Sequence, residues 1–171
     1  PIITNCIINN TNYGIYAFQA SNPVIQNNEI SNTLYTPVAL SVSADPTFSG
    51  NSFVNTGWTA LGIIGEELGF DGTVKLRNVA GYDSIAYVLL EDLTINSGTY
   101  VNVEAGVVLK MNRHTDIFVN GGFQAIGTAT DTIIFTSIRD DNYGNPKDTE
   151  DDGDATSPSA GNWGNIRYQA T

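Results

Sequence analysis

Short runs of apolar residues alternate with polar ones through most of the chain, separated by Asn, Gly and Pro. Alternation at a period of two residues predicts β-strands with one buried face, and the many Asn, Gly and Pro residues argue against helices. One phrase recurs: segment 1–10 returns at 23–32 and again at 46–55, at spacings of 22 and 23 residues. A repeat of this length, built from short strands, is typical of one coil of a parallel β-solenoid.

Matching positions in the three copies hold residues of the same kind. The apolar columns are Ile3, Ile25 and Phe48, and Ile8, Ile30 and Phe53. In a solenoid such residues point inward and stack on the next coil, with strands about 4.8 Å apart. The Asn columns are Asn10, Asn32 and Asn55, and Asn28 and Asn51, which align with Cys6. Asn tolerates left-handed backbone and can bond to an Asn one coil along, so we expect Asn ladders and a small, buried Cys6.

The second half of the chain repeats more loosely. Leu93–Ile95 is matched 24 residues on by Ile117–Val119, while other apolar pairs recur at spacings of 22 and 26 residues. Corners of unequal length account for this drift, and no Pro/Ser-rich linker separates the halves. We therefore predict one all-β module, a parallel β-helix of about seven coils. Its parts are Asn-rich coils at 1–64, a connecting coil at 65–92, Val/Ile-rich coils at 93–138, an acidic loop at 139–162 and a half coil at 163–171.

Charge narrows the range of partners. Seven Lys and Arg against 18 Asp and Glu leave a net charge of -11, which argues against nucleic acid and anionic membrane surfaces as partners. No apolar run approaches the roughly 20 residues of a membrane-spanning helix, so we expect no membrane insertion. Together with the all-β pattern, this composition favours an extracellular or cell-surface location.

Two parts of the chain carry a family resemblance. The first half resembles the right-handed parallel β-helix repeats of the pectate-lyase-like superfamily. Segments 88–111 and 117–141 resemble the β-helix modules of large prokaryotic surface and secreted proteins. The resemblance covers nearly the whole chain and implies this fold. The resemblance does not identify the function, because the superfamily includes lyases, hydrolases, adhesins, phage spikes and purely structural stalks.

The sequence offers little for catalysis. Polysaccharide lyases of this fold use carboxylate-held Ca²⁺ with an Arg or Lys base, and hydrolases use paired Asp residues. The first 60 residues contain no Lys or Arg and only Glu29 and Asp45 as acids. His114 lies in a short polar corner, where we expect an exposed turn residue. We therefore expect no enzyme activity and no catalytic residue.

Two alternatives to a structural role stay open. One is part of a polysaccharide lyase or hydrolase that lacks its own catalytic site. The other is a glycan-binding adhesin module with polysaccharide as its partner, which would need exposed aromatic residues in line. The candidates for that row are Tyr13, Tyr16, Tyr35, Trp58, Tyr100 and Tyr143.

The acidic loop contains a candidate calcium site. Asp148, Glu150 and Asp152 precede Gly153 in the pattern of a calcium loop, and Asp154 adds a further carboxylate. Seven of the 18 acids lie between residues 140 and 154, and this density would repel itself without a cation. Position 12 of the pattern is Ser159 instead of a bidentate Glu, so a solvated acidic loop is the competing interpretation. We expect weak Ca²⁺ binding.

The ends of the sequence align as neighbouring halves of one coil. When residue 171 is joined to residue 1, segment 166–171 followed by Pro1 matches segment 40–46 without a gap. An open solenoid end exposes apolar side chains and strand edges. We therefore predict a repeat unit of an extracellular fibre, stalk or surface filament that binds copies of itself head to tail, as covalent tandem repeats in preference to separate subunits. The predicted contact residues are Pro1, Ile3, Ile166, Tyr168 and Thr171.

Overall fold

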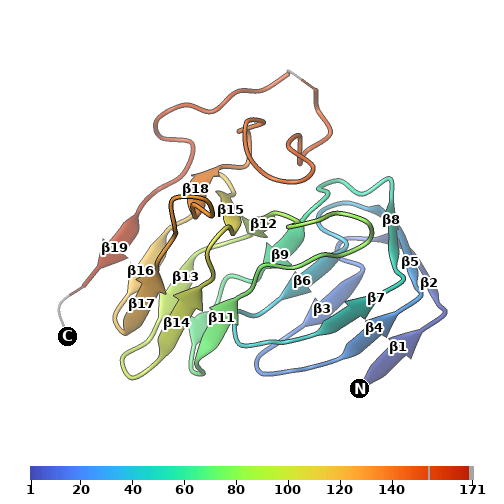
Figure 1. Cartoon of the computed structure of the whole chain (residues 1–171), viewed down its shortest axis with the longest axis horizontal. Helices are drawn as coiled ribbons and strands as arrows, with labels where there is room; N and C mark the ends of the chain where they lie inside the picture. Colours follow the sequence, from blue (N-terminus) through green and yellow to red (C-terminus); the bar gives the residue numbers. More distant parts are fainter. Residues whose placement is uncertain (154, 170–171) are drawn as a thin grey trace.

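The chain folds as a parallel β-solenoid in a computed structural model that describes residues 1–153 and 155–169 (Figure 1). No helix occurs among these residues. The first three coils contain β1 (Ile2–Thr4), β2 (Ile7–Thr11), β3 (Ile15–Ala17), β4 (Val24–Gln26), β5 (Glu29–Thr33), β6 (Val38–Leu40), β7 (Thr47–Ser49), β8 (Ser52–Val54) and β9 (Leu61–Ile63). The later coils contain β10 (Glu67–Leu68), β11 (Gly72–Val74), β12 (Tyr87–Leu89), β13 (Leu93–Ile95), β14 (Tyr100–Val103), β15 (Val108–Met111), β16 (Ile117–Val119), β17 (Gly122–Ala125), β18 (Ile134–Ser137) and β19 (Ile166–Tyr168).

Each strand pairs in parallel with its counterpart one coil along. A six-stranded sheet, β3-β6-β9-β12-β15-β18, runs through six coils. The other faces are the three-stranded sheets β1-β4-β7, β2-β5-β8 and β11-β14-β17 and the four-stranded sheet β10-β13-β16-β19. The chain thus completes six coils, and β19 opens a seventh, which confirms the predicted all-β solenoid of about seven coils.

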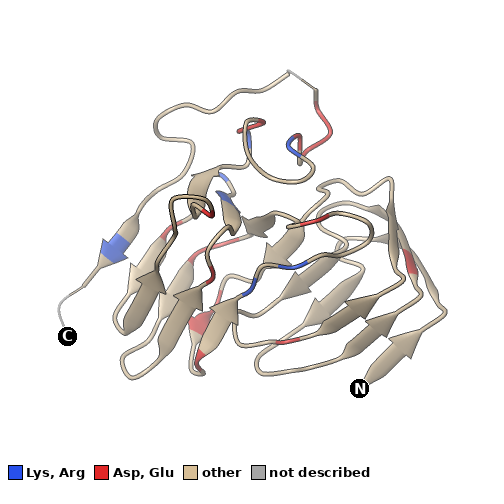
Figure 2. Cartoon of the chain, in the orientation of Figure 1, with Lys and Arg blue, Asp and Glu red and all other residues tan. Residues whose placement is uncertain are grey.

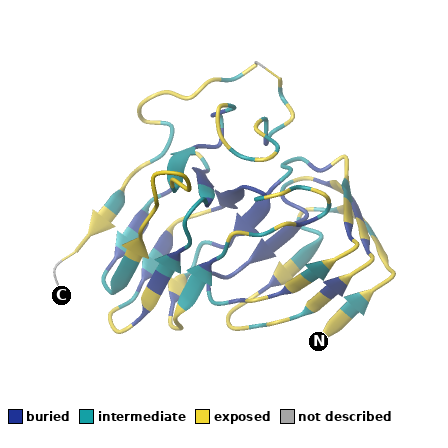
Figure 3. Cartoon of the chain, viewed as in Figure 1, coloured by how far each residue is buried: buried dark blue, intermediate teal, exposed yellow. Residues whose placement is uncertain are grey.

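The predicted inward columns set the register of the first coils. Ile3 pairs with Ile25, which in turn pairs with Phe48, and Ile8, Ile30 and Phe53 do the same on the next face. Ile25 and Ile30, in the second coil, are completely buried. Ile3 and Ile8, in the first coil, are only half-buried, because no coil covers them on one side (Figure 3).

The solenoid changes its cross-section between the third and fourth coils. The sheets that contain β7 and β8 end there, and those that contain β10 and β11 begin, so only the six-stranded sheet crosses the junction. The connecting segment 75–86 is irregular apart from an antiparallel bridge between Val79 and Tyr82. Asp45 helps to join the two parts, because its carboxylate binds Lys75 at 2.6 Å and Arg77 at 2.8 Å. These two cations hold the pKa of Asp45 below its usual value.

Asn residues occupy the corners of the first three coils. The Asn51 Oδ1 accepts hydrogen bonds from the backbone N–H and the side-chain amide of Asn28, at 3.0 and 3.1 Å. The Asn28 Oδ1 accepts from the backbone N–H of Cys6 at 3.0 Å. Asn28 and Asn51 are buried, so this column satisfies backbone groups that water cannot reach. Cys6 itself is exposed, and the expectation of a buried thiol is wrong, because its coil is the outermost one.

A second Asn column lies on the surface. Asn10, Asn32 and Asn55 share a left-handed backbone, with φ of 59°, 51° and 52°. The Asn55 amide donates to Asn32, and the Asn32 amide donates to Asn9 at 2.8 Å. The side-chain column therefore passes through Asn9 in the first coil, while Asn10 shares only the corner conformation.

The alignment of segment 166–171 with segment 40–46 is wrong in register. Leu40 ends β6 in the six-stranded sheet, whereas Ile166 pairs with Ile117 in the sheet β10-β13-β16-β19. Both segments are short and alternate apolar with polar residues, and the repeat pattern does not distinguish the faces. The segment 163–169 still begins a new coil.

Candidate functional site

The acidic loop, residues 139–162, covers part of the outer face of the six-stranded sheet (Figure 1). It leaves β18, crosses above β12 and β15 and returns to the solenoid at β19. The Thr149 carbonyl accepts a hydrogen bond from the Thr59 backbone N–H at 2.8 Å, and the Asn145 side chain donates to the Asp83 carbonyl at 2.6 Å. Thr149 is fully buried. The loop is therefore attached to the third and fourth coils, far from its own position in the sequence.

Apolar residues lie beneath and beside the loop. They form a second hydrophobic cluster outside the solenoid interior, against which Tyr13 and Trp58 also pack. The members of this cluster are Ala39, Ala60, Ile64, Val88, Leu90 and Ile138. The outer face of this sheet is thus partly an apolar surface, and its cover stabilises the fold through burial.

Lys110 is a buried cation under the acidic loop. It lies in β15 with no exposed surface, and its Nζ donates to the Lys147 carbonyl at 2.5 Å. Desolvation lowers the pKa of Lys110, against the opposing charges of Asp141, Asp140, Asp148 and Glu150. A buried positive charge that the sequence pattern did not indicate therefore lies beneath the loop.

Three carboxylates of the loop lie together. Asp141, Asp148 and Asp152 each contribute an oxygen, and these atoms lie within 4.8 Å of one another. The Asp148 carboxylate also accepts the backbone N–H groups of Asp152 and Gly153, at 3.2 and 2.8 Å. Burial, followed by the charge of Asp148, raises the pKa of Asp141. Three hard oxygen donors at this spacing could hold a divalent cation, with water completing the shell.

The cluster differs from the predicted calcium residues. Asp148 and Asp152 are brought together, and Asp141 joins them from the start of the loop, where an adjacent Asp pair was the available signal. Glu150 lies outside the cluster, and burial raises the pKa of its carboxyl. Asp154 lies outside the described residues. Figure 2 shows acidic residues and a basic residue close together in the loop above the sheet.

Asp140 has a structural position. Its carboxylate accepts hydrogen bonds from the Thr136 hydroxyl and from both the backbone and side-chain N–H of Asn142. Burial alone would raise the pKa of Asp140, but these hydrogen bonds hold it below its usual value. Asp140 is therefore tied to the base of the loop.

Four of the six candidate aromatic residues gather in one row. Tyr13, Tyr35 and Trp58 follow one another along successive coils: the rings of Tyr13 and Tyr35 stack at 5.2 Å, and that of Trp58 is tilted against Tyr35 at 5.1 Å. Tyr16 joins this row through Tyr13 at 6.0 Å, and Phe18, which the sequence did not single out, follows at 6.4 Å. Tyr16 and Phe18 are about half exposed, at 53% and 50%.

The other two candidate aromatics lie elsewhere. Tyr100, in β14, donates its hydroxyl proton to Gln124 on β17, and Tyr143 is part of the acidic loop. His114 is exposed in a corner with a φ of 62° and accepts from the Arg113 side chain at 3.0 Å. It has the geometry of the expected turn residue.

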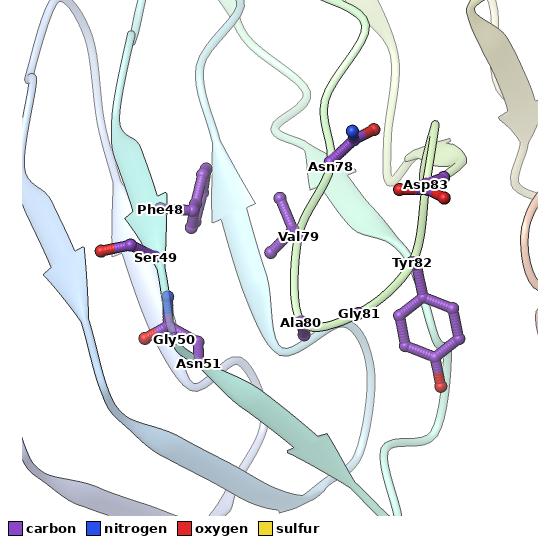
Figure 4. A pocket seen from close by; sticks show the side chains of 10 residues that line it. All are labelled: Phe48, Ser49, Gly50, Asn51, Asn78, Val79, Ala80, Gly81, Tyr82 and Asp83. Atoms are coloured by element: carbon purple, nitrogen blue, oxygen red, sulfur yellow. The ribbon is translucent and has the colours of Figure 1, made fainter.

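A hollow of about 210 Å³ opens where the solenoid changes cross-section. Figure 4 shows the corner Phe48–Asn51 facing the turn Asn78–Asp83. Asp83 is the one carboxylate in its lining, and no basic residue lines it. The hollow provides no acid–base pair and follows from the end of the sheets that contain β7 and β8.

The predicted inter-unit residues lie at the two ends of the solenoid, β1 at one end and β19 at the other (Figure 1). Ile3 points inward in the first coil, and the Pro1 carbonyl accepts from Val24 at 2.9 Å. Ile166 packs against the core, and Tyr168 is 69% exposed. Thr171 lies outside the described residues.

Comparison with known families agrees with this geometry. A family model described as a right handed beta helix region matches residues 1–138. Comparison with curated proteins and with solved structures finds no match. Among the described residues, no helix is long and apolar enough to cross a membrane.

Proposed function

Because the chain belongs to the right-handed β-helix family, we propose that it is a rigid structural module of an extracellular fibre, stalk or surface filament. In this role the coils of one module stack on further coils, supplied by copies of the same module. The proposal assigns no catalytic residue.

One observation carries the proposal: the apolar interior reaches both ends of the solenoid without a polar cover. The inward residues Ile3, Ile8 and Ile15 of the first coil are only half-buried, as are Phe123 and Phe135 near the other end. Their counterparts in the middle coils have almost no exposed surface. Solenoids need capped ends for solubility, and another coil is the cover that matches this surface in shape and chemistry.

The strand edges support the same role. Among the described residues, β1, β2 and β3 each have a parallel neighbour on one side only, and so do β17, β18 and β19. Open parallel edges of this kind pair readily with further strands. Contact between different ends of identical modules is heterologous and extends as a fibre when it does not close. The net charge of -11 favours side-to-side repulsion between such fibres.

The test compares one copy of the 171-residue chain with two copies joined directly in tandem. We expect the tandem protein to appear in electron micrographs as one straight rod, longer by about 30 Å for six coils. It should also melt in one transition at a higher temperature than the single copy. Two separately melting globules at variable angles would refute the stacking role.

Substitutions at the end surface provide a control. Ile8→Asp places a charge on the end surface. With this substitution the tandem protein should melt in two steps instead of one. Ile7→Asp changes a neighbouring residue that is 76% exposed on the outer face, so it should leave the rod intact.

A further inference from the structure

A small cavity lies beside the aromatic row, on the outer surface of the solenoid. Its volume is about 100 Å³, and it is lined by Tyr13, Tyr16, Ile64, Gly65, Leu90 and Glu91. These residues come from the first coil and from the segments that follow β9 and β12. Any side chain at position 65 would collide with the Glu91 Cβ and the Asp92 carbonyl. Gly65 therefore permits the close approach that brings Glu91 to the cavity.

One carboxylate with no internal cation lies at this cavity. Glu91 lines it and, within the described part of the chain, forms no ion pair with Lys or Arg. Glu66 follows the lining residue Gly65 but is not part of the lining, and burial raises the pKa of its carboxyl against a hydrogen bond from Ser41. An ionised carboxylate only accepts hydrogen bonds, so Glu91 can accept from a bound donor.

Tyrosine rings form the other wall of the cavity. Tyr13 is fixed by its stack on Tyr35 and by the apolar cluster, while Tyr16 remains 53% exposed. Burial and then the charges of Glu66 and Glu91 raise the pKa of Tyr16. Tyr16 therefore stays neutral at physiological pH and presents an intact ring face. Such a face attracts cations that approach within about 6 Å of its centre.

We infer that this cavity binds a primary ammonium group, with Glu91 as acceptor and the Tyr16 ring as a cation–π wall. An ammonium supplies three donors and a positive charge, which match an unpaired carboxylate beside an aromatic ring. A neutral sugar would leave the charge of Glu91 uncompensated. The site does not depend on the proposed stacking role, since its residues lie along the outer surface.

The test measures binding of n-butylammonium and n-butanol, which differ in charge and little in shape, to the full chain by NMR titration. We expect millimolar binding of n-butylammonium, with shifts at residues 13–16, 64–66 and 90–91, and no saturable binding of n-butanol. Glu91→Gln and Tyr16→Ala should each weaken binding at least about fivefold. Glu67→Gln is the matched control, because Glu67 is the exposed neighbour of Glu66, and it should have no effect.

Further ligands identify the source of the ammonium group. Nα-acetyl-lysine amide represents a protein side chain, and glucosamine represents an amino sugar. Tighter binding of either indicates the natural partner, whereas glucose should not bind. Equal binding of n-butanol or glucose, or full binding by Glu91→Gln with an unchanged melting temperature, would overturn the inference. Glu91 is exposed, so its substitution tests the site without loss of the fold.

Discussion

Replacement of Lys110 by Met tests whether a buried ammonium fixes the acidic loop. The change keeps the length of the side chain and removes its charge, together with the 2.5 Å hydrogen bond to the Lys147 carbonyl. The neighbouring carboxylates of the loop then lose the cation beneath them, and the Lys147 carbonyl loses its donor. Lys75→Met is the matched control, because Lys75 is a surface lysine paired with Asp45, which also binds Arg77.

The expected loss of stability follows from two opposing effects. A hydrogen bond to a charged group contributes roughly 1.5–3 kcal/mol, and the repulsion between loop acids adds to its loss. Removal of a buried charge relieves part of its desolvation cost, which offsets some of that loss. We expect Lys110→Met to lower the unfolding free energy by about 1–3 kcal/mol, with a fall in Tm of about 2–4 °C per kcal/mol. Lys75→Met should cost at most about 1 kcal/mol.

Urea unfolding and hydrogen exchange distinguish a fixed loop from a loosely attached one. In Lys110→Met, backbone amides of residues 140–152 should lose protection more than those of β13 and β16, which lie in the interior. High salt should narrow the difference from the native chain, since screening reduces the repulsion between loop acids. If Lys110→Met has the unfolding free energy of the native chain and the loop amides keep their protection, Lys110 is not the cation that holds the loop.

Three further predictions concern the Asn column, pH and calcium. Asn51→Ala removes the acceptor for the buried Asn28 N–H and should cost about 1–3 kcal/mol in urea unfolding; a cost below that of the exposed Asn55→Ala would contradict the buried column. Burial raises the pKa of the Asp141 and Glu150 carboxyls, so the folded chain binds their protons more tightly than the unfolded chain. Their stabilising contribution is full below the unfolded pKa and is lost as pH rises through the folded pKa, so loop protection should increase on acidification from pH 7 toward about pH 5; a decrease would contradict this sign. Calorimetry should detect weak Ca²⁺ binding that Asp148→Asn abolishes and Glu150→Gln retains; no heat at millimolar Ca²⁺ would refute the calcium site.

The sequence predicts the first three coils well because residues of the same type recur there at matching positions. Ile3, Ile25 and Phe48 recur at nearly constant spacing, and stacking requires the register that the spacing implies. The prediction fails at Ile166, which was aligned with Leu40 on a different face. Strands of three residues carry the same alternation on every face of a solenoid, so the pattern alone cannot assign the sheet.

The candidate sites depend on contacts between distant segments. Lys110 is flanked by apolar residues in β15. The alternation of inward and outward positions along this strand predicts an outward, solvated Lys110 side chain. It is buried because a loop that begins about 30 residues later covers it. Asp141 joins Asp148 and Asp152 by the same folding of the loop. Glu91 and Tyr16 line one cavity because the coils stack, and no local motif links them.

The single continuous sheet at the junction has a mechanical consequence. Inter-coil hydrogen bonds in a solenoid lie nearly along its long axis, so a pulling force at the two ends loads them directly. Between the third and fourth coils the strand pairing is that of β9 with β12, three residue pairs, assisted by the ion cluster of Asp45, Lys75 and Arg77. Neighbouring coils share the load over three sheets. Under tension the module therefore has a built-in yield point near its middle, where it would extend or bend before its ends separate.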